Sequence, residues 1–237
     1  MALTRHLHCP GTAPLMLRLV GEELRRTGRR LRRRLGRIQP PHLPSGRFDA
    51  PDSQLATQAT ELVRALSSPH LLHHCQRTWA FGVALAAQHG RRFDAELLYV
   101  SSLLHDLGLT ETHRGPAPFE LRGARVARAW CCEHGMPPAR ADRVHEAIAL
   151  HTSLGVTERE PESLYVHLGA GVDVFGLRIE ELSAPTLDAI LERWPRLGFK
   201  QGLIEDLQPE IDNPGSPLTG MWKLGFEGQI RGAPFMD

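Results

Sequence analysis

Two adjacent polar residues, His105 and Asp106, interrupt the end of an otherwise apolar stretch, LYVSSLLHDLGLT. Neighbouring side chains on a helix project about 100° apart, so an imidazole and a carboxylate at consecutive positions can approach one metal ion from neighbouring directions. A doublet of this kind also occurs where a helix simply ends at the protein surface. The residues elsewhere in the chain must therefore decide between a metal site and an ordinary helix end.

Further candidates for chemistry occur before and after this doublet. His74 and Arg77, in LLHHCQRTWAFG, share one helical face because they are three residues apart. His151 stands at the end of a predicted helix in EAIALHTS, and Asp173 lies among small residues in HLGAGVDVFG, where two helices can approach closely. These segments supply imidazoles and carboxylates, which are side chains that bind divalent transition metals.

The order of these segments resembles the HD superfamily of metal-dependent hydrolases. More narrowly, the segments RTWAFG, ELLYVSSLLHDLGLT, FELRGA, EAIALHTSLG and GAGVDVFG resemble its cyanamide hydratase-like branch, over about residues 55 to 230. The resemblance implies an enzyme that activates water for the hydration or hydrolysis of a small-molecule substrate. It also implies that four side chains bind one divalent metal: His74, His105, Asp106 and Asp173.

His73 is a rival to His74, but the resemblance places the ligand three residues before Arg77, which is His74. We expect Zn²⁺ or Fe²⁺ in the first place, with Mn²⁺ or Ni²⁺ as alternatives, because imidazoles and carboxylates bind all four ions. A metal held in this way lowers the pKa of bound water towards about 7, and a second group is normally needed to move protons.

Three residues are candidates for catalytic roles. His151 matches the histidine that other HD proteins place on the helix before the last Asp; the alternative is a helix-terminal residue beside the macrodipole. Glu120 precedes a Gly-Ala pair that permits close packing, and its alternative is an exposed glutamate in a first helical turn. Arg77 either holds an anionic substrate group or pairs with a carboxylate of the metal site.

Two positions depart from patterns in the superfamily. Dinuclear members carry a histidine four residues before the Gly of the Gly-Ala pair, where this chain has Phe119, and several nucleotidases carry a glutamate where it has Leu109. We therefore expect a single metal. The second hypothesis is an HD phosphohydrolase acting on nucleotides or phosphate esters. An oxygen-using di-iron member would need two more histidine ligands in the middle of the chain.

The net charge of +1, from 28 Lys+Arg and 27 Asp+Glu in 237 residues, conceals an uneven distribution. Residues 1–50 contain 11 arginines and three acidic residues, which gives +8 and leaves −7 for the remainder. We predict that residues 1–52 form a basic N-terminal arm and Pro-rich linker, solvated and partly disordered. Arginines are so dense in residues 21–37 that we expect no face of this segment to be buried, and the role of the Arg-rich segment 25–37 is left open. The alternative is contact with nucleic acid or an acidic surface. No aromatic residue lies among the arginines to stack on a base.

Residues 53–237 are predicted to form one all-α domain, an HD-domain helical bundle of about seven or eight helices. Apolar residues recur at helical spacing between short Gly/Pro breaks, and no strand pair with a hairpin signal occurs. The tail from residue 209 onwards is expected to wrap the bundle as an irregular segment. The predicted helices span about residues 53–66, 69–88, 94–108, 119–134, 137–152, 161–175, 185–193 and 199–207.

No run of about 18 apolar residues exists, so we expect no transmembrane segment. The cysteines, which are Cys9, Cys75, Cys131 and Cys132, show neither CxxC nor framework spacing. This pattern is typical of thiols in a reducing compartment, and we expect a cytoplasmic protein. The sequence leaves the oligomeric state open, a homo-oligomer included.

Overall fold

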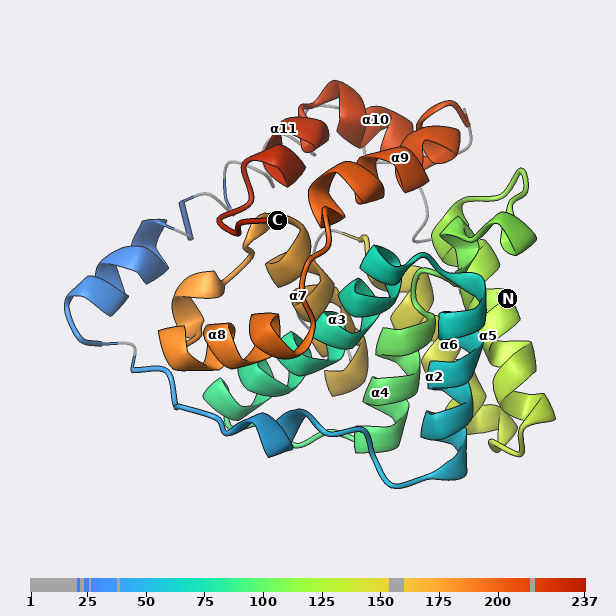
Figure 1. The fold of residues 1–237 in the computed structure, drawn as a ribbon, viewed down its shortest axis with the longest axis horizontal. Coiled ribbons are helices and arrows are strands. Elements are labelled where there is room, and N and C mark those ends of the chain that lie inside the picture. Colours follow the sequence, from blue (N-terminus) through green and yellow to red (C-terminus); the bar gives the residue numbers. More distant parts are fainter. Residues whose placement is uncertain (1–20, 22–23, 26, 38, 154–159, 214–215) are drawn as a thin grey trace.

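A computed structural model describes residues 21–237 except 22–23, 26, 38, 154–159 and 214–215 (Figure 1). Throughout these described ranges the secondary structure is helical and no strand occurs, which confirms the all-α fold class. None of the described helices is long and apolar enough to cross a bilayer. Cys75, Cys131 and Cys132 are free thiols, while Cys9 lies outside the described residues.

The bundle begins with helices whose first residues the sequence marks clearly. The Ser53 side chain accepts a hydrogen bond from the Ala56 amide, and the Asp94 side chain accepts one from the Leu97 amide, so both residues cap helices. The helices of this part are α2 (Gln54–Leu66), α3 (Pro69–Gln88), α4 (Ala95–Leu104), α5 (Phe119–Glu133), α6 (Pro138–Leu150), α7 (Pro161–Phe175) and α8 (Ala184–Arg193). Prolines open α3, α6 and α7, where a missing amide proton does no harm.

The helix that carries the His-Asp doublet ends earlier than its apolar pattern indicates. The predicted range reached residue 108, whereas α4 ends at Leu104 and His105 is its C-cap. Asp106 then leads into the short 3₁₀ helix η3 (Leu107–Leu109). The two adjacent polar residues therefore occupy a turn between two helices, where the chain can direct both side chains inwards.

The prediction of an irregular tail is wrong, because the tail contains regular helices. α9 (Phe199–Ile211) continues through Pro209, and α10 (Pro217–Lys223) and α11 (Phe226–Arg231) follow it. Proline near the end of a helix removes one hydrogen bond without breaking the preceding turns, and α10 and α11 have too few residues for a periodic pattern to be recognised. The number of helices in the described ranges therefore exceeds the expected seven or eight.

Two hydrophobic cores result from this arrangement. The larger one is formed mainly by α2 to α8 and includes Phe48, whose carbonyl oxygen accepts a hydrogen bond from Trp79 Nε1. The smaller one lies beneath α9, α10 and α11, which together are called the cover here, and includes Leu71, Phe119 and Phe199. Figure 1 shows the cover lying across one side of the bundle, next to α3 and α7.

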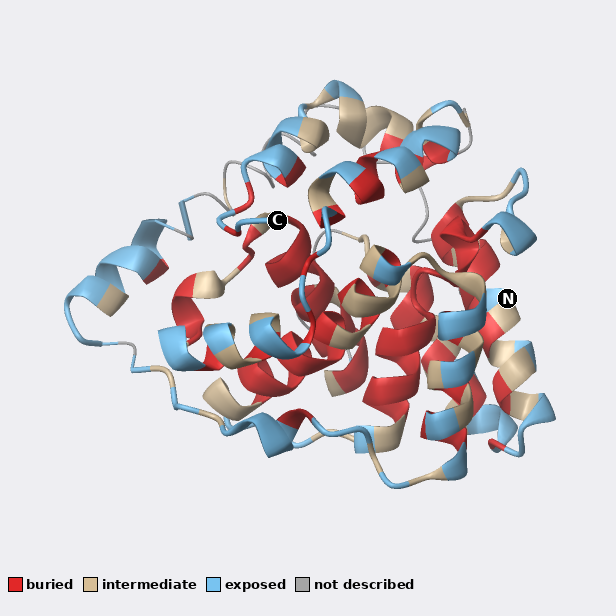
Figure 2. Cartoon of the chain, viewed as in Figure 1, coloured by how far each residue is buried: buried red, intermediate tan, exposed pale blue. Residues whose placement is uncertain are grey.

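Part of the arm is helical, up to residue 34, and one of its arginines is buried. Figure 2 shows this segment as mainly exposed, but Arg29 is only 8% exposed because its Nε donates to Glu180 Oε1 over 2.6 Å. The prediction that no arginine face would be buried is therefore wrong at this position. The partner of Arg29 is Glu180, one of two adjacent buried acidic residues. The density of arginines in the sequence did not indicate this partner.

Glu181 is the second member of that acidic pair. Its carboxylate lies 2.7 Å from His89 Nε2, 3.4 Å from Arg29 Nε and 3.6 Å from Arg178 Nη1. Burial raises the pKa of this carboxyl, but the hydrogen bond from His89 and the charges of Arg178 and Arg29 outweigh burial, so its pKa is lowered. The boundary between the arm (residues 1–52) and the helical domain (residues 53–237) stays a prediction.

Candidate metal centre

Close packing of α3 against α7 fixes the relative positions of two candidate ligands. A Cβ atom at Gly82 would stand 2.8 Å from the Tyr165 carbonyl oxygen, and one at Gly169 would stand 3.1 Å from the Gly82 amide nitrogen. Only glycines allow this approach, which confirms that small residues near Asp173 let two helices come together. His74 on α3 and Asp173 on α7 are thereby brought side by side.

A second close approach supports the His-Asp turn. A Cβ atom at Gly123 on α5 would stand 3.1 Å from the Gly108 amide nitrogen and 3.4 Å from the His105 carbonyl oxygen. The Gly-Ala pair after Glu120 therefore presses α5 against the turn that carries His105 and Asp106. The backbone of α5 is therefore in close contact with the backbone of this turn, which leaves the turn little freedom to move.

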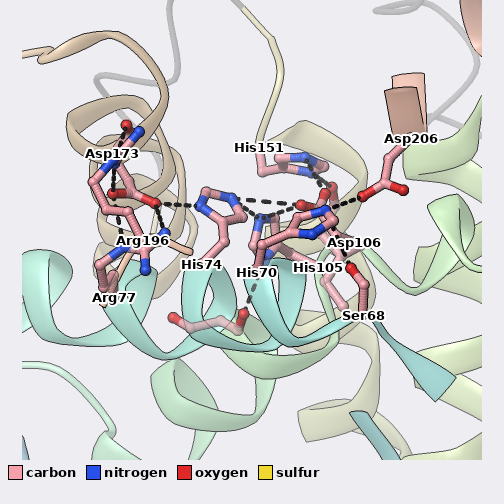
Figure 3. A network of polar contacts seen from close by, with 12 residues as sticks. Ser68, His70, His74, Arg77, His105, Asp106, His151, Asp173, Arg196 and Asp206 are labelled. Carbon is pink, nitrogen blue, oxygen red and sulfur yellow. Dashed lines mark hydrogen bonds and ion pairs between the residues drawn. The ribbon is translucent and has the colours of Figure 1, made fainter. Parts of the chain in front are cut away.

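Three of the four predicted ligands form a compact group, called the ligand cluster here: His74, His105 and Asp106 (Figure 3). Their ligand atoms lie within 4.8 Å of one another, and all three residues are buried. The distance from His74 Nε2 to His105 Nε2 is 3.2 Å, and Asp106 Oδ2 lies 3.5 Å from the first nitrogen and 3.2 Å from the second. Two nitrogens and one oxygen thus face a common point.

The hydrogen bonds on the outer side of both imidazoles show why this group fits a divalent metal. His74 Nδ1 lies 2.7 Å from Asp173 Oδ2, and His105 Nδ1 lies 2.8 Å from the Ser102 carbonyl oxygen. Both partners are acceptors, so each Nδ1 carries the ring proton and each Nε2 presents a lone pair. Two lone pairs 3.2 Å apart repel each other unless a proton or a metal ion lies between them. A metal ion satisfies both nitrogens and the carboxylate together.

Asp173 lies on the opposite side of the His74 ring from this common point (Figure 3). Its carboxylate accepts hydrogen bonds from Arg77 Nε at 2.9 Å, Arg77 Nη2 at 2.8 Å and Arg196 Nη1 at 2.6 Å, besides the one from His74. Burial raises the pKa of Asp173, but Arg77 and His74 outweigh it and the pKa is lowered. Direct binding of a metal by Asp173 stays a prediction, while its contact with His74 is part of the structure.

The Arg77 guanidinium is fully engaged by the protein around Asp173. Beyond its two bonds to the carboxylate, Nη1 donates to the carbonyl oxygens of Trp194 and Pro195 at 3.0 and 3.1 Å. Of the two roles considered from the sequence, pairing with a carboxylate is the one that this geometry matches. A catalytic role of Arg77 stays a prediction.

Two residues around His74 were not among the site residues predicted from the sequence. Arg196 follows α8 and is 4% exposed, and Phe199 begins α9 and stacks on the His74 ring with centroids 4.6 Å apart. The guanidinium carbons of Arg77 and Arg196 lie 5.1 and 4.9 Å from the Phe199 ring centroid. Neither residue belongs to a periodic pattern or motif, so nothing in the sequence distinguished it from other arginines and phenylalanines.

His151 and Glu120 lie on the other side of the ligand cluster. His151 is the C-cap of α6, its Nδ1 donates to the Ile148 carbonyl oxygen at 2.6 Å, and its Nε2 lies 3.5 Å from Asp106 Oδ1. Glu120 is 3% exposed, and its Oε2 has no hydrogen-bond partner within the described part of the chain. Burial raises the pKa of Glu120. Glu120 is therefore not the exposed glutamate of its alternative, whereas His151 does lie at a helix C-terminus, as its alternative states, and is buried there. The catalytic roles of both residues stay predictions.

Residues 71–188 match the family model of the HD domain. These residues form an HD domain. The chain is also similar to the cyanamide hydratases DDI2 and DDI3 of Saccharomyces cerevisiae, each 28% identical over 153 residues. Each alignment covers 62% of this chain and 68% of the yeast protein. The HD domain thus contains the ligand cluster, while the cover and the arm lie outside the matched range.

The charges within the HD domain favour a bound cation. Burial lowers the pKa of His74. Burial also acts to lower the pKa of His105, but the adjacent Asp106 carboxylate outweighs it and raises that pKa. Burial acts to raise the pKa of Asp106, yet His105, His151 and His74 hold it well below its ordinary value. The ionised carboxylate thus favours a positive charge beside it, and a divalent metal bound here takes the place of the proton that His105 otherwise holds.

The two positions that depart from other HD proteins are apolar, and one of them contacts His151. The Phe119 ring meets the His151 ring edge to face, with centroids 5.5 Å apart. Leu109 is 5% exposed and packs in the smaller core with Phe119. Neither side chain can bind a second metal or donate a proton.

Proposed function

We propose that this HD domain is a mononuclear metal-dependent enzyme that adds water to a small nitrogen-containing molecule of the cyanamide or nitrile class. The observation that supports it most is the pair of Nε2 lone pairs facing Asp106, each set by an acceptor on the other side of its ring. A divalent metal bound there supplies Lewis-acid activation of water at neutral pH. Zn²⁺ or Fe²⁺ is proposed first, and Mn²⁺ or Ni²⁺ as alternatives.

The residues around His74 hold it in one orientation. Asp173 accepts the Nδ1 proton, and Arg77 and Arg196 fix Asp173 by three charge-assisted hydrogen bonds. Phe199 stacks on the ring and prevents its rotation. In this proposal Arg77 acts by positioning the carboxylate.

Proton transfer is assigned to His151 and Glu120. The Nδ1 proton of His151 is held by the Ile148 carbonyl, so Nε2 is free to accept a proton from water beside Asp106. Glu120 lies close enough to His151 for their charges to interact, and burial favours its protonated form. In the hydration of a nitrile, water adds an OH group to carbon and the nitrogen gains two protons after tautomerisation. His151 accepts one proton of the water and Glu120 donates one proton to nitrogen, which gives an imidic acid. The hydroxyl proton of the imidic acid then moves from oxygen to nitrogen to give the amide, and transfer of the proton from His151 to Glu120 restores both side chains.

The surroundings favour a small, uncharged substrate over a phosphate ester. Arg77 and Arg196, beside the ligand cluster, are both bound to Asp173, so neither is directed at a reacting phosphate. Phe199 and Phe119, which contact His74 and His151, provide apolar, buried surfaces. The phosphohydrolase hypothesis needs cationic groups facing the substrate, and the described residues around the cluster do not supply them.

Metal content provides the first test. Wild-type protein should bind about one metal per chain by elemental analysis, while the double variant His105→Ala, Asp106→Ala should bind none at the same site. His134→Ala removes an exposed histidine and serves as the control that should retain the metal. Retained stoichiometry in the double variant would contradict the assignment of the ligand cluster.

A substrate screen tests the reaction. The metal-loaded protein is incubated with cyanamide, organic nitriles, isonitriles and nucleotides, using each of the four metals. We expect formation of urea from cyanamide, or of an amide from a nitrile, and loss of that activity in His151→Ala by about 100-fold or more. Phosphate release from nucleotides without any hydration product would favour the phosphohydrolase instead.

A further inference from the structure

The arm contains a helical segment with leucines along one side, called the arm helix here: residues 24, 25 and 27–34 are helical, and the Leu35 amide donates to the Leu31 carbonyl oxygen at 2.9 Å. Leu24, Leu31 and Leu35 are 69%, 57% and 61% exposed. At about 100° per residue, these three positions fall within about 40° of one another around the helix axis. They form a continuous apolar stripe.

The opposite side of the arm helix attaches it to the protein. Arg29 and Arg33 lie roughly 140° and 180° around the axis from this stripe. Arg29 Nε binds Glu180 Oε1 at 2.6 Å, and Arg33 Nη1 donates to the Glu180 carbonyl oxygen at 3.1 Å. Because this side faces Glu180, the leucine stripe points away from the bundle. Figure 2 shows the arm helix at the edge of the molecule, largely exposed.

Arginines flank the stripe on both sides. Arg32 lies roughly 80° from it in one direction, and Arg34 and Arg30 lie roughly 80° and 120° from it in the other. All three are exposed. Arg30 and Arg34, together with Arg33, also line an open hollow of about 590 Å³ beside Leu187.

We propose that the arm helix binds to the surface of an anionic lipid bilayer, lying parallel to it. The exposed leucines enter the boundary between headgroups and acyl chains, and the flanking arginines bind lipid phosphates. A nucleic acid would bind the arginines through its phosphates but would leave the leucine stripe exposed to water. The arm helix also has no aromatic residue for stacking on bases. The ion pair of Arg29 with Glu180 then orients the whole protein on the membrane surface.

The test uses the full chain and sedimentation with lipid vesicles. We expect binding to vesicles that contain phosphatidylglycerol and little binding to pure phosphatidylcholine. Replacing the flanking arginines in the triple variant Arg30→Gln, Arg32→Gln, Arg34→Gln should weaken the partition coefficient by roughly 100-fold, because each arginine near an anionic surface contributes about a factor of five. The control Arg91→Gln, Arg92→Gln removes two exposed arginines from the bundle and should leave binding unchanged.

The leucines distinguish a membrane from other polyanions. The triple variant Leu24→Ser, Leu31→Ser, Leu35→Ser keeps every charge and should reduce vesicle binding by about 30-fold or more. Replacement of the same three leucines by methionine should restore it. Vesicle binding that is unaffected by the serine variant would overturn the proposal. So would tighter binding to an RNA or to an acidic protein that is insensitive to the serine variant.

Discussion

Gly169→Ala is expected to damage both the packing of the bundle and the ligand cluster. The added Cβ would stand 3.0 Å from the Thr78 carbonyl carbon and 3.1 Å from the Gly82 amide nitrogen, and closer still to the Thr78 carbonyl oxygen. All three atoms belong to the backbone of α3, so no flexible side chain can move aside. α7 must shift away from α3 by a displacement on the order of 1 Å.

The magnitude follows from two opposing terms. Overpacking against backbone destabilises by about 3 kcal/mol or more, while alanine in place of a helical glycine contributes about 1 kcal/mol of stability. The net loss is about 2 kcal/mol, which corresponds to a fall in Tm of roughly 4–8 °C for a chain of this size. Asp173 lies one helical turn beyond Gly169, so its bond to the His74 Nδ1 lengthens and metal content falls.

Thermal unfolding followed by circular dichroism checks this expectation, with elemental analysis of the same samples. Gly228→Ala is the matched control, because Gly228 lies within α11 and an added Cβ meets no atom within 4 Å. This control should raise Tm by roughly 2–4 °C. A Gly169→Ala variant that is as stable as the wild type, with full metal content, would refute the reasoning.

Three further predictions concern buried groups. Arg196→Gln leaves the Asp173 carboxylate with one guanidinium and should reduce the free energy of unfolding in urea by about 2–3 kcal/mol; an unchanged midpoint would contradict this. Burial raises the pKa of Cys131 to about 12, so at pH 8 a thiol reagent should modify the partly exposed Cys132 and leave Cys131 intact until the protein unfolds, as peptide mapping can show. Because the pKa of Glu181 is lowered by folding, its contribution to stability is present above the unfolded pKa and lost as pH falls through the folded one. Unfolding from pH 7 to 3 should therefore show a smaller loss of stability for Glu181→Gln than for the wild type, whereas parallel profiles would exclude this.

Local signals in the sequence were sufficient to predict most helices of the bundle. Ser53 and Asp94 cap α2 and α4, and Pro69 opens α3. These effects depend on a few neighbouring residues, so they act in the same way in any fold. The grouping of His74, His105 and Asp106 could also be predicted, because the resemblance to HD proteins places them in order along helices that must pack together.

The surroundings of His74 could not be predicted in the same way. Arg196 and Phe199 reach it because the chain turns through Leu197 and Gly198, whose φ angles are 56° and 73°. A left-handed leucine is unusual, and no local pattern indicates it. The contact of Arg29 with Glu180 spans 151 residues and depends equally on packing between distant elements.

The separate core beneath the cover sets the order in which parts of this protein can open. The cover is held to the bundle by the smaller core and by polar contacts such as the one from His70 to Asp206 at 2.8 Å. Local opening exposes only the surface of the part that opens, so its free energy is lower than that of global unfolding. Amide protons of α9 to α11 should exchange with solvent before those of α3 and α7. The buried ligand cluster is then reached from solvent through fluctuations of the cover, while the bundle that positions its histidines stays folded.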